Sequence, residues 1–199
     1  MAELFLSQIP VEEAVARDGS GAAAVGRGPA QLAVLCLISV VSMLFAGFAS
    51  AYLVRRVGTD WQPVLLPRLL WLNTAVLLVS SLTLARAQRA QRKLLSAAAT
   101  RWLAVTALLG LVFLLGQVAA WRQLAAEGFY LPANPYNSFF YVLTAAHALH
   151  VLGGIAALLY VLLRAFRANL NVDLLYSCAT YWHFMDGLWV ALFVLLLFF

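Results

Sequence analysis

Long apolar runs separated by short polar segments are the dominant pattern along this chain. A helix needs ~20 mostly apolar residues to cross the hydrocarbon core of a bilayer. The second of five such segments reaches this length only if it is extended through Pro67, which is tolerated in a first helical turn. We therefore predict an all-α polytopic membrane bundle of five transmembrane helices, forming one membrane domain over residues 31–199. The predicted spans are residues 31–54, 64–85, 102–121, 138–163 and 174–199.

The composition indicates that lipid is the main solvent of the chain. Of its 199 residues, 64% are hydrophobic and 11% are charged, and the mean hydropathy is +0.90. Soluble domains have about 25% charged residues, and a core of this size could not hide so many apolar side chains from water. The net charge of +5 could suggest nucleic-acid binding. However, the cations flank the apolar runs, where they orient a membrane protein, so we predict no nucleic-acid partner.

The polar segment at residues 86–101 decides the predicted topology. It holds five cations and no acidic residue, and the positive-inside rule places such a loop in the cytoplasm. Alternation then puts the N-terminus inside and the C-terminus outside. Residues 1–30 lack the short apolar core of a signal peptide, so we predict a mobile cytoplasmic tail there. Cys36 and Cys178 lie inside apolar runs, and we expect both to be buried as small apolar residues.

Polar residues inside the predicted spans recur on single helix faces. Such groups are costly in lipid, so they should face protein, a cavity or one another. The faces predict helices that pack with their polar stripes inward, or against a larger partner. The main polar positions are Asn73, Gln117, His147, His150, His183 and Asp186.

The residues alone leave three interpretations of the histidines and Asp186 open. Imidazole and carboxylate are suitable ligands for a metal or a haem. Intramembrane histidine and aspartate chains also carry protons or ions in transporters. In the third interpretation the groups fix helix packing, and His183 and Asp186, at i and i+3, can pair on one helix face. We favour packing, because the sequence lacks broken helices, repeat symmetry and axially separated histidine pairs.

Several strings resemble subunit III of the haem–copper oxidases, the cytochrome c oxidase family. The most specific is Tyr-Trp-His-Phe-Met-Asp at 181–186 followed by Trp189, and the second is Ala-His-Ala-Leu-His-Val at 146–151. The segments at 45–52, 72–78 and 114–117 match the preceding helices in order. The resemblance covers all five spans and points to the short form, because the first two helices of the seven-helix form are absent. Two membrane carboxylates of the long form are replaced here, one by the segment at 40–42 and one by Ala120.

The resemblance implies an accessory subunit of an enzyme complex, with no catalytic residue, cofactor or metal ligand of its own. Haem and copper are expected on its partner, catalytic subunit I, beside subunit II, further small subunits and bound phospholipid. In a bacterial cytoplasmic membrane the chain would support assembly, stability and proton uptake during aerobic respiration. The alternatives are the equivalent partner of a quinol oxidase or nitric oxide reductase, a small ion-coupled transporter, or a haem-binding membrane protein. The residues that we expect to act in helix packing are Asn73, Gln117, His147, His150, Trp182, His183, Asp186 and Trp189.

Overall fold

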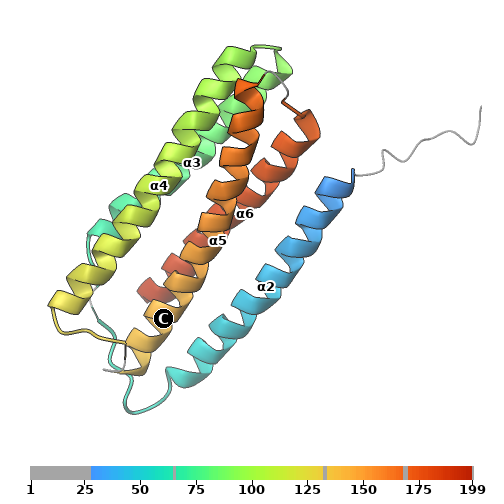
Figure 1. Cartoon of the computed structure of the whole chain (residues 1–199). Helices are drawn as coiled ribbons and strands as arrows, with labels where there is room; N and C mark the ends of the chain where they lie inside the picture. The colour runs from blue at the N-terminus through green and yellow to red at the C-terminus, as the bar shows by residue number, and fades with distance from the viewer. Residues whose placement is uncertain (1–27, 65, 132–133, 168–169, 199) are drawn as a thin grey trace, which may run out of the picture.

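The computed structural model describes residues 28–64, 66–131, 134–167 and 170–198, and the regular structure of these residues is entirely helical. Each of its five helices is long and apolar enough to cross a bilayer, which confirms the predicted all-α class and the number of spans. The predicted tail, apart from residues 28–30, lies outside the described residues. The helices are α2 (Pro29–Arg55), α3 (Leu69–Arg92), α4 (Ser96–Ala126), α5 (Pro135–Phe166) and α6 (Val172–Phe198) (Figure 1).

Helix α3 differs from the expected second span at both ends. It begins at Leu69 and not at residue 64, because Pro67 lacks an amide hydrogen and disfavours helical backbone at the residue before it. At its other end α3 continues through the basic segment to Arg92, since alanine, arginine and glutamine are strong helix formers. The turn into α4 is therefore short, and Leu94 adopts a left-handed backbone there, with a φ of 57°.

Helices α5 and α6 each contact three other helices. Helix α6 packs against α2, α3 and α5, while α3 pairs with α4 and α4 with α5 (Figure 1). In the described part of the chain α2 contacts only α5 and α6, and its buried side chains are Val41, Phe45 and Tyr52. Cys36 of α2 is consequently exposed and not buried as expected, whereas Cys178 of α6 is buried. One broad side of α2 is left facing outward.

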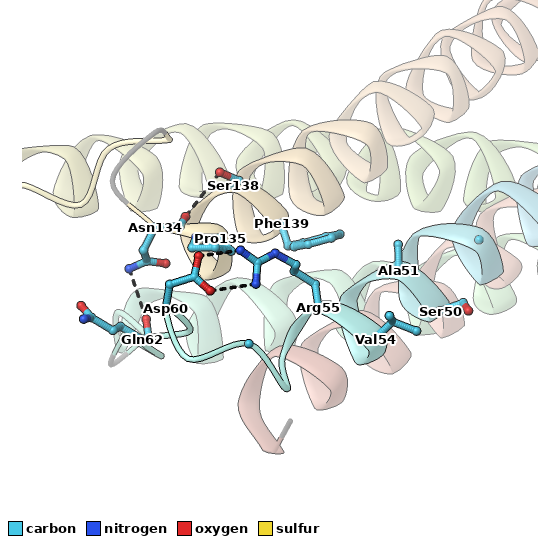
Figure 2. A pocket seen from close by; sticks show the side chains of 12 residues that line it. Ser50, Ala51, Val54, Arg55, Asp60, Gln62, Asn134, Pro135, Ser138 and Phe139 are labelled. Atoms are coloured by element: carbon cyan, nitrogen blue, oxygen red, sulfur yellow. Dashed lines mark hydrogen bonds and ion pairs between the residues drawn. The ribbon is translucent and has the colours of Figure 1, made fainter.

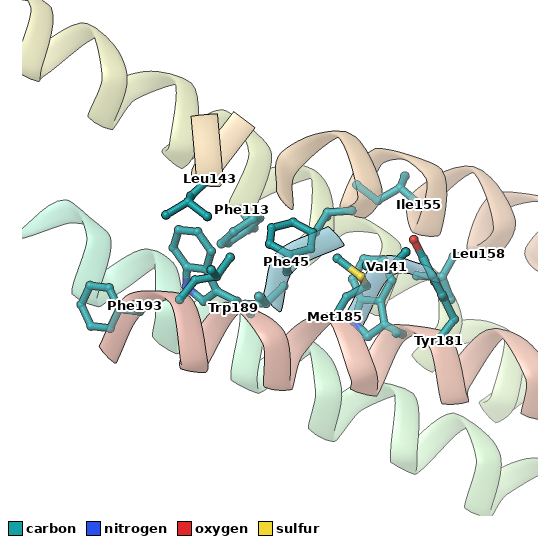
Figure 3. Close-up of a cluster of buried hydrophobic side chains, with 14 of the residues drawn as sticks. Val41, Phe45, Phe113, Leu143, Ile155, Leu158, Tyr181, Met185, Trp189 and Phe193 are labelled. Carbon is teal, nitrogen blue, oxygen red and sulfur yellow. The ribbon is translucent and has the colours of Figure 1, made fainter. Parts of the chain in front are cut away.

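Aromatic side chains fill the centre of the bundle (Figure 3). The ring of Trp189 on α6 lies 5.1 Å from that of Phe113 on α4, measured between centroids. The indole Nε1 of Trp189 donates to Thr74 Oγ1 at 2.9 Å, and that of Trp182 donates to Ser80 Oγ at 3.0 Å. A buried indole N–H needs an acceptor, so these two bonds fix the rotation of α6 against α3.

Trp182 also depends on two glycines of neighbouring helices. A Cβ atom added at Gly110 of α4 would lie 2.6 Å from Trp182 Cη2, and one added at Gly154 of α5 would lie 3.1 Å from Trp182 Cε3. The indole therefore occupies space that α4 and α5 leave open by carrying no side chain. Gly153 differs from its neighbour, because a Cβ there would meet nothing within 4 Å.

Candidate functional site

Asn73 joins α3 to α4 where the two helices approach closely. It is buried, and its Nδ2 donates to the backbone carbonyl of Phe113 at 3.1 Å. A Cβ atom at Gly116 would lie 2.3 Å from Asn73 Oδ1, so a glycine is needed on the facing helix. A buried amide bonded in this way stabilises the helix pair and offers nothing to a ligand.

His147 lies in a cage of aromatic rings at the bundle centre. Its side chain is 0% exposed, and its ring centroid is 5.0 Å from Trp189, 5.9 Å from Phe113 and 6.5 Å from Phe45. Neither ring nitrogen has a hydrogen-bond partner in the described part of the chain. The three rings belong to three different helices, so His147 is a packing centre for α2, α4, α5 and α6.

Gln117 of α4 lies at the same level as His147. Trp121 Nε1 donates to Thr144 Oγ1 at 3.0 Å across the antiparallel helices α4 and α5. Gln117 precedes Trp121 by four residues and His147 follows Thr144 by three, so both lie about one turn further along the same interface. Gln117 is 1% exposed and its amide atoms also lack a described partner. The polar atoms of both side chains are thus buried in the α4–α5 interface without a hydrogen bond to the described residues.

His150 lies one turn after His147 on α5 and also packs against α2. Its Nδ1 lies 2.7 Å from the Ala146 carbonyl oxygen, and because a carbonyl only accepts, Nδ1 carries the hydrogen. Its ring centroid is 5.7 Å from that of Phe45. The Tyr181 hydroxyl donates to the His150 carbonyl at 3.2 Å. These contacts tie α2, α5 and α6 together, and Phe45 packs against both His147 and His150.

His183 and Asp186 do not pair with each other as expected. His183 Nδ1 lies 2.6 Å from Ser81 Oγ on α3. The carboxyl oxygens of Asp186 lie beside the same hydroxyl but make no bond within ordinary hydrogen-bond geometry. Ser81 was not singled out in the sequence, because the three-residue spacing on α6 identifies neighbours on that helix and not on α3. The arrangement is a small polar cluster between α3 and α6.

A large groove lies at the predicted outer end of the bundle, between α2 and the start of α5 (Figure 2). Arg55 forms an ion pair with Asp60, with bonds of 2.8 and 2.5 Å. The hydrogen bond from Arg55 lowers the pKa of the Asp60 carboxyl. On the facing side Asn134 Nδ2 donates to the Gln62 carbonyl at 3.2 Å. These contacts hold the α2–α3 connection against the N-terminus of α5.

The polar side chains thus form separate contacts between helices and do not converge on one centre. Among the described residues, no group of three or more His, Cys, Asp and Glu side chains is placed to hold a metal ion. The polar groups instead connect α3 to α4, α4 to α5 and α3 to α6. Fold and site together define a multi-pass membrane protein of the helical-bundle class, in which Asn73, Trp182, His183 and Trp189 form hydrogen bonds between helices.

Comparison with known proteins identifies the particular family. Residues 6–199 match the family described as cytochrome c oxidase subunit III. The chain is 34% identical over 168 residues to a probable cytochrome c oxidase subunit 3 of Mycobacterium tuberculosis, covering 78% of this chain and 81% of the relative. It is 34% identical over 176 residues to cytochrome c oxidase subunit 3 of Thermostichus vulcanus, covering 83% and 85%. The corresponding Synechocystis protein is 33% identical over 174 residues, covering 81% and 72%. The chain belongs to the cytochrome c oxidase subunit III family and is thus a subunit of a respiratory haem–copper oxidase complex.

Proposed function

We propose that this chain is a non-redox subunit that docks on the catalytic subunit of its oxidase through one face of α6. The catalytic subunit would carry the haem and copper. The proposed docking surface, here called the α6 face, lies between α2 and α3. It consists of Thr180, His183, Gly187 and Ala191 of α6, with Ser42, Ala46 and Ala49 of α2 and Ser81 of α3 along its edges.

The observation that carries the proposal is a contrast between the outward surfaces of the helices. The exposed positions of α3 and α4 are largely aliphatic, as lipid contact requires; they include Leu72, Leu78, Val79, Leu82, Leu108, Leu111, Leu115 and Val118. The α6 face exposes Thr180, His183, Gly187 and Ala191 beside Val190 and Val194, so small and polar residues interrupt its aliphatic surface. A groove of about 290 Å³ lies between α2 and α6 beside it. In membranes small residues let helix backbones approach closely, and polar side chains bond across helices.

The placement of this face and the family support the proposed partner, location and role. The helices make up nearly all of the described residues, so a contact with a larger partner would lie mainly in the membrane. The relatives are bacterial, which supports a cytoplasmic membrane location. Docked there beside subunit II, further small subunits and phospholipid, the chain would stabilise the assembled oxidase and its proton uptake. The proposal assigns it no redox centre.

Two glycine substitutions test the docking surface. Both Gly187 of α6 and Gly153 of α5 are exposed, and a Cβ atom at either would meet nothing within 4 Å, so leucine at either site is expected to leave the bundle intact. Gly187→Leu should release the chain from a complex purified through a tag on the catalytic subunit, because it fills the α6 face. Gly153→Leu should remain bound. Equal retention of both variants would contradict docking through this face.

A further inference from the structure

His183 has one ring nitrogen inside the bundle and one accessible at the α6 face. Its Nδ1 is occupied by Ser81 Oγ at 2.6 Å. The side chain is half-buried, and Nε2 is neither buried nor bonded within the described part of the chain. What Nε2 offers to a partner depends on whether it carries the hydrogen, because a neutral imidazole has one donor and one acceptor nitrogen.

Asp186 decides that question. It lies one turn from His183, is 4% exposed, and has its carboxyl group beside the Ser81 hydroxyl. Helix α6 contains no lysine or arginine, and Arg86, the nearest cation along α3, lies over the Trp102 ring at 5.0 Å. An ionised carboxylate without a cation is strongly disfavoured inside a membrane. Asp186 is therefore neutral and has an O–H group to donate.

The hydrogen bond of the cluster then has a defined direction. The Asp186 oxygens beside Ser81 make no hydrogen bond as they lie, but the neutral carboxyl is the strongest donor of the cluster and the imidazole nitrogen its strongest acceptor. The Ser81 hydroxyl therefore donates to His183 Nδ1 at 2.6 Å. With Nδ1 accepting, the hydrogen of the neutral ring is on Nε2. We infer that His183 Nε2–H is the hydrogen-bond donor by which this chain is recognised by a polar acceptor on a transmembrane helix of the catalytic subunit. The inference rests on the proposed function and names the chemistry of its contact.

The depth of His183 favours a protein acceptor over a lipid one. It lies 11 residues after the start of α6 at Val172 and 15 before its end at Phe198, which is about 16 and 22 Å along the axis. That position is near the middle of a hydrocarbon core ~30 Å thick, far from headgroups and ester carbonyls. Gly187 and Ala191 lie beside it on the α6 face, so a partner helix can approach closely enough to bond.

The donor is particular to His183 among the partly exposed histidines. His150 carries its hydrogen on Nδ1, because that atom faces the Ala146 carbonyl. Its Nε2 is consequently an acceptor, and its ring packs against Phe45 of α2. Nitrogen-15 spectra of the histidine-labelled chain should therefore show opposite tautomers for the two residues.

Two substitutions separate the outward donor from the inward contact. Gln places an N–H group near the position of Nε2, so His183→Gln keeps the donor. Asn reaches only to the position of Nδ1, so His183→Asn keeps the inward contact and loses the donor. In complexes held through a tag on the catalytic subunit, release of this chain is measured during detergent dilution. Asn should weaken retention roughly 3- to 16-fold, the range of one interhelical hydrogen bond in a membrane. Gln should stay within about twofold of wild type by the same measure.

Each other outcome counts against the inference. Retention of the Asn variant at the wild-type level, or equal loss of both variants, would overturn the assigned donor. If the isolated full-length Asn variant were destabilised as much as its retention in the complex is weakened, His183 would act only within the bundle. Self-association of the isolated wild-type chain that the Asn variant loses would make a second copy the occupant. A wild-type chain that is not retained at all would instead contradict the proposed function itself.

Discussion

Gly110 of α4 packs directly against the indole of Trp182, so a side chain at this position should destabilise the bundle. A Cβ atom there would lie 2.6 and 3.0 Å from two ring atoms of Trp182 and 3.2 Å from Ile155 Cγ1. The indole cannot easily retreat, because Ser80 holds its Nε1 and Gly154 packs against its other edge. Gly110→Ala must therefore displace a buried tryptophan or separate α4 from α6.

The expected magnitude combines opposing effects. Overpacking costs about 1–3 kcal/mol, and a weakened Trp182–Ser80 hydrogen bond adds about 1 kcal/mol. Alanine recovers about 1 kcal/mol of helix propensity relative to glycine. The net loss should thus be about 1–3 kcal/mol. Gly153→Ala has the same propensity gain without a clash, so it should be neutral or slightly stabilising.

The assay is reversible unfolding of the purified chain in mixed detergent micelles, followed by helical circular dichroism. Gly110→Ala should lower the free energy of unfolding relative to both wild type and Gly153→Ala. Gly154→Ala should fall between them, because its Cβ would lie 3.1–3.3 Å from Trp182 and Tyr181. If the Gly110 and Gly153 variants were equally stable, the assigned position of Trp182 between α4 and α5 would be refuted.

Three further predictions concern topology, the Asp186 carboxyl and the outer ion pair. In a cysteine-free background, a membrane-impermeant reagent should label a cysteine at Leu131 in intact cells and one at Leu94 only after the membrane is opened; the reverse pattern would invert the topology. Asp186→Asn retains a side-chain hydrogen-bond donor and should leave assembly and the proton-to-electron ratio intact, whereas loss of pumping in an assembled complex would support a proton relay. Asp60 has a lowered pKa in the folded chain because of Arg55. The stabilisation of the folded chain by this ion pair is therefore complete above the unfolded pKa of about 4 and is lost as the pH falls through the folded pKa. The protection of the amides in the α2–α3 connection, corrected for intrinsic exchange at each pH, should fall on acidification in wild type. It should already be low at neutral pH in Asp60→Asn, and a variant with the wild-type profile would show that the ion pair is not responsible.

The five spans could be predicted because lipid imposes a length and an apolar composition on every helix that crosses it. The same constraint makes a polar stripe informative, and Asn73, Gln117, His147 and Asp186 are all buried in the structure. The first residue of α3 could not be predicted from the apolar pattern alone. Val64 and Leu66 are as apolar as the helix, and the effect of Pro67 on its neighbours sets the boundary.

Partners across helices could not be read from spacing. The positions of His183 and Asp186 on one face suggested an internal pair, but the rotation of α6 against α3 gives Ser81 to His183. That rotation depends on Trp182 and Trp189 finding acceptors on α3, which are contacts between residues more than 100 positions apart. Likewise, Gly153 and Gly154 are identical in the sequence, and only the packing around Trp182 distinguishes them.

The most direct test of the account is purification of the native complex through a tag on this chain. The catalytic subunit should be recovered in a one-to-one ratio, with haem absorbance and copper that scale with its amount. The same chain expressed alone should show neither signal. The account would be contradicted if the tagged chain were recovered from its native membrane without a haem–copper subunit. A stoichiometric haem on the isolated chain, lost in His147→Ala, would contradict it equally.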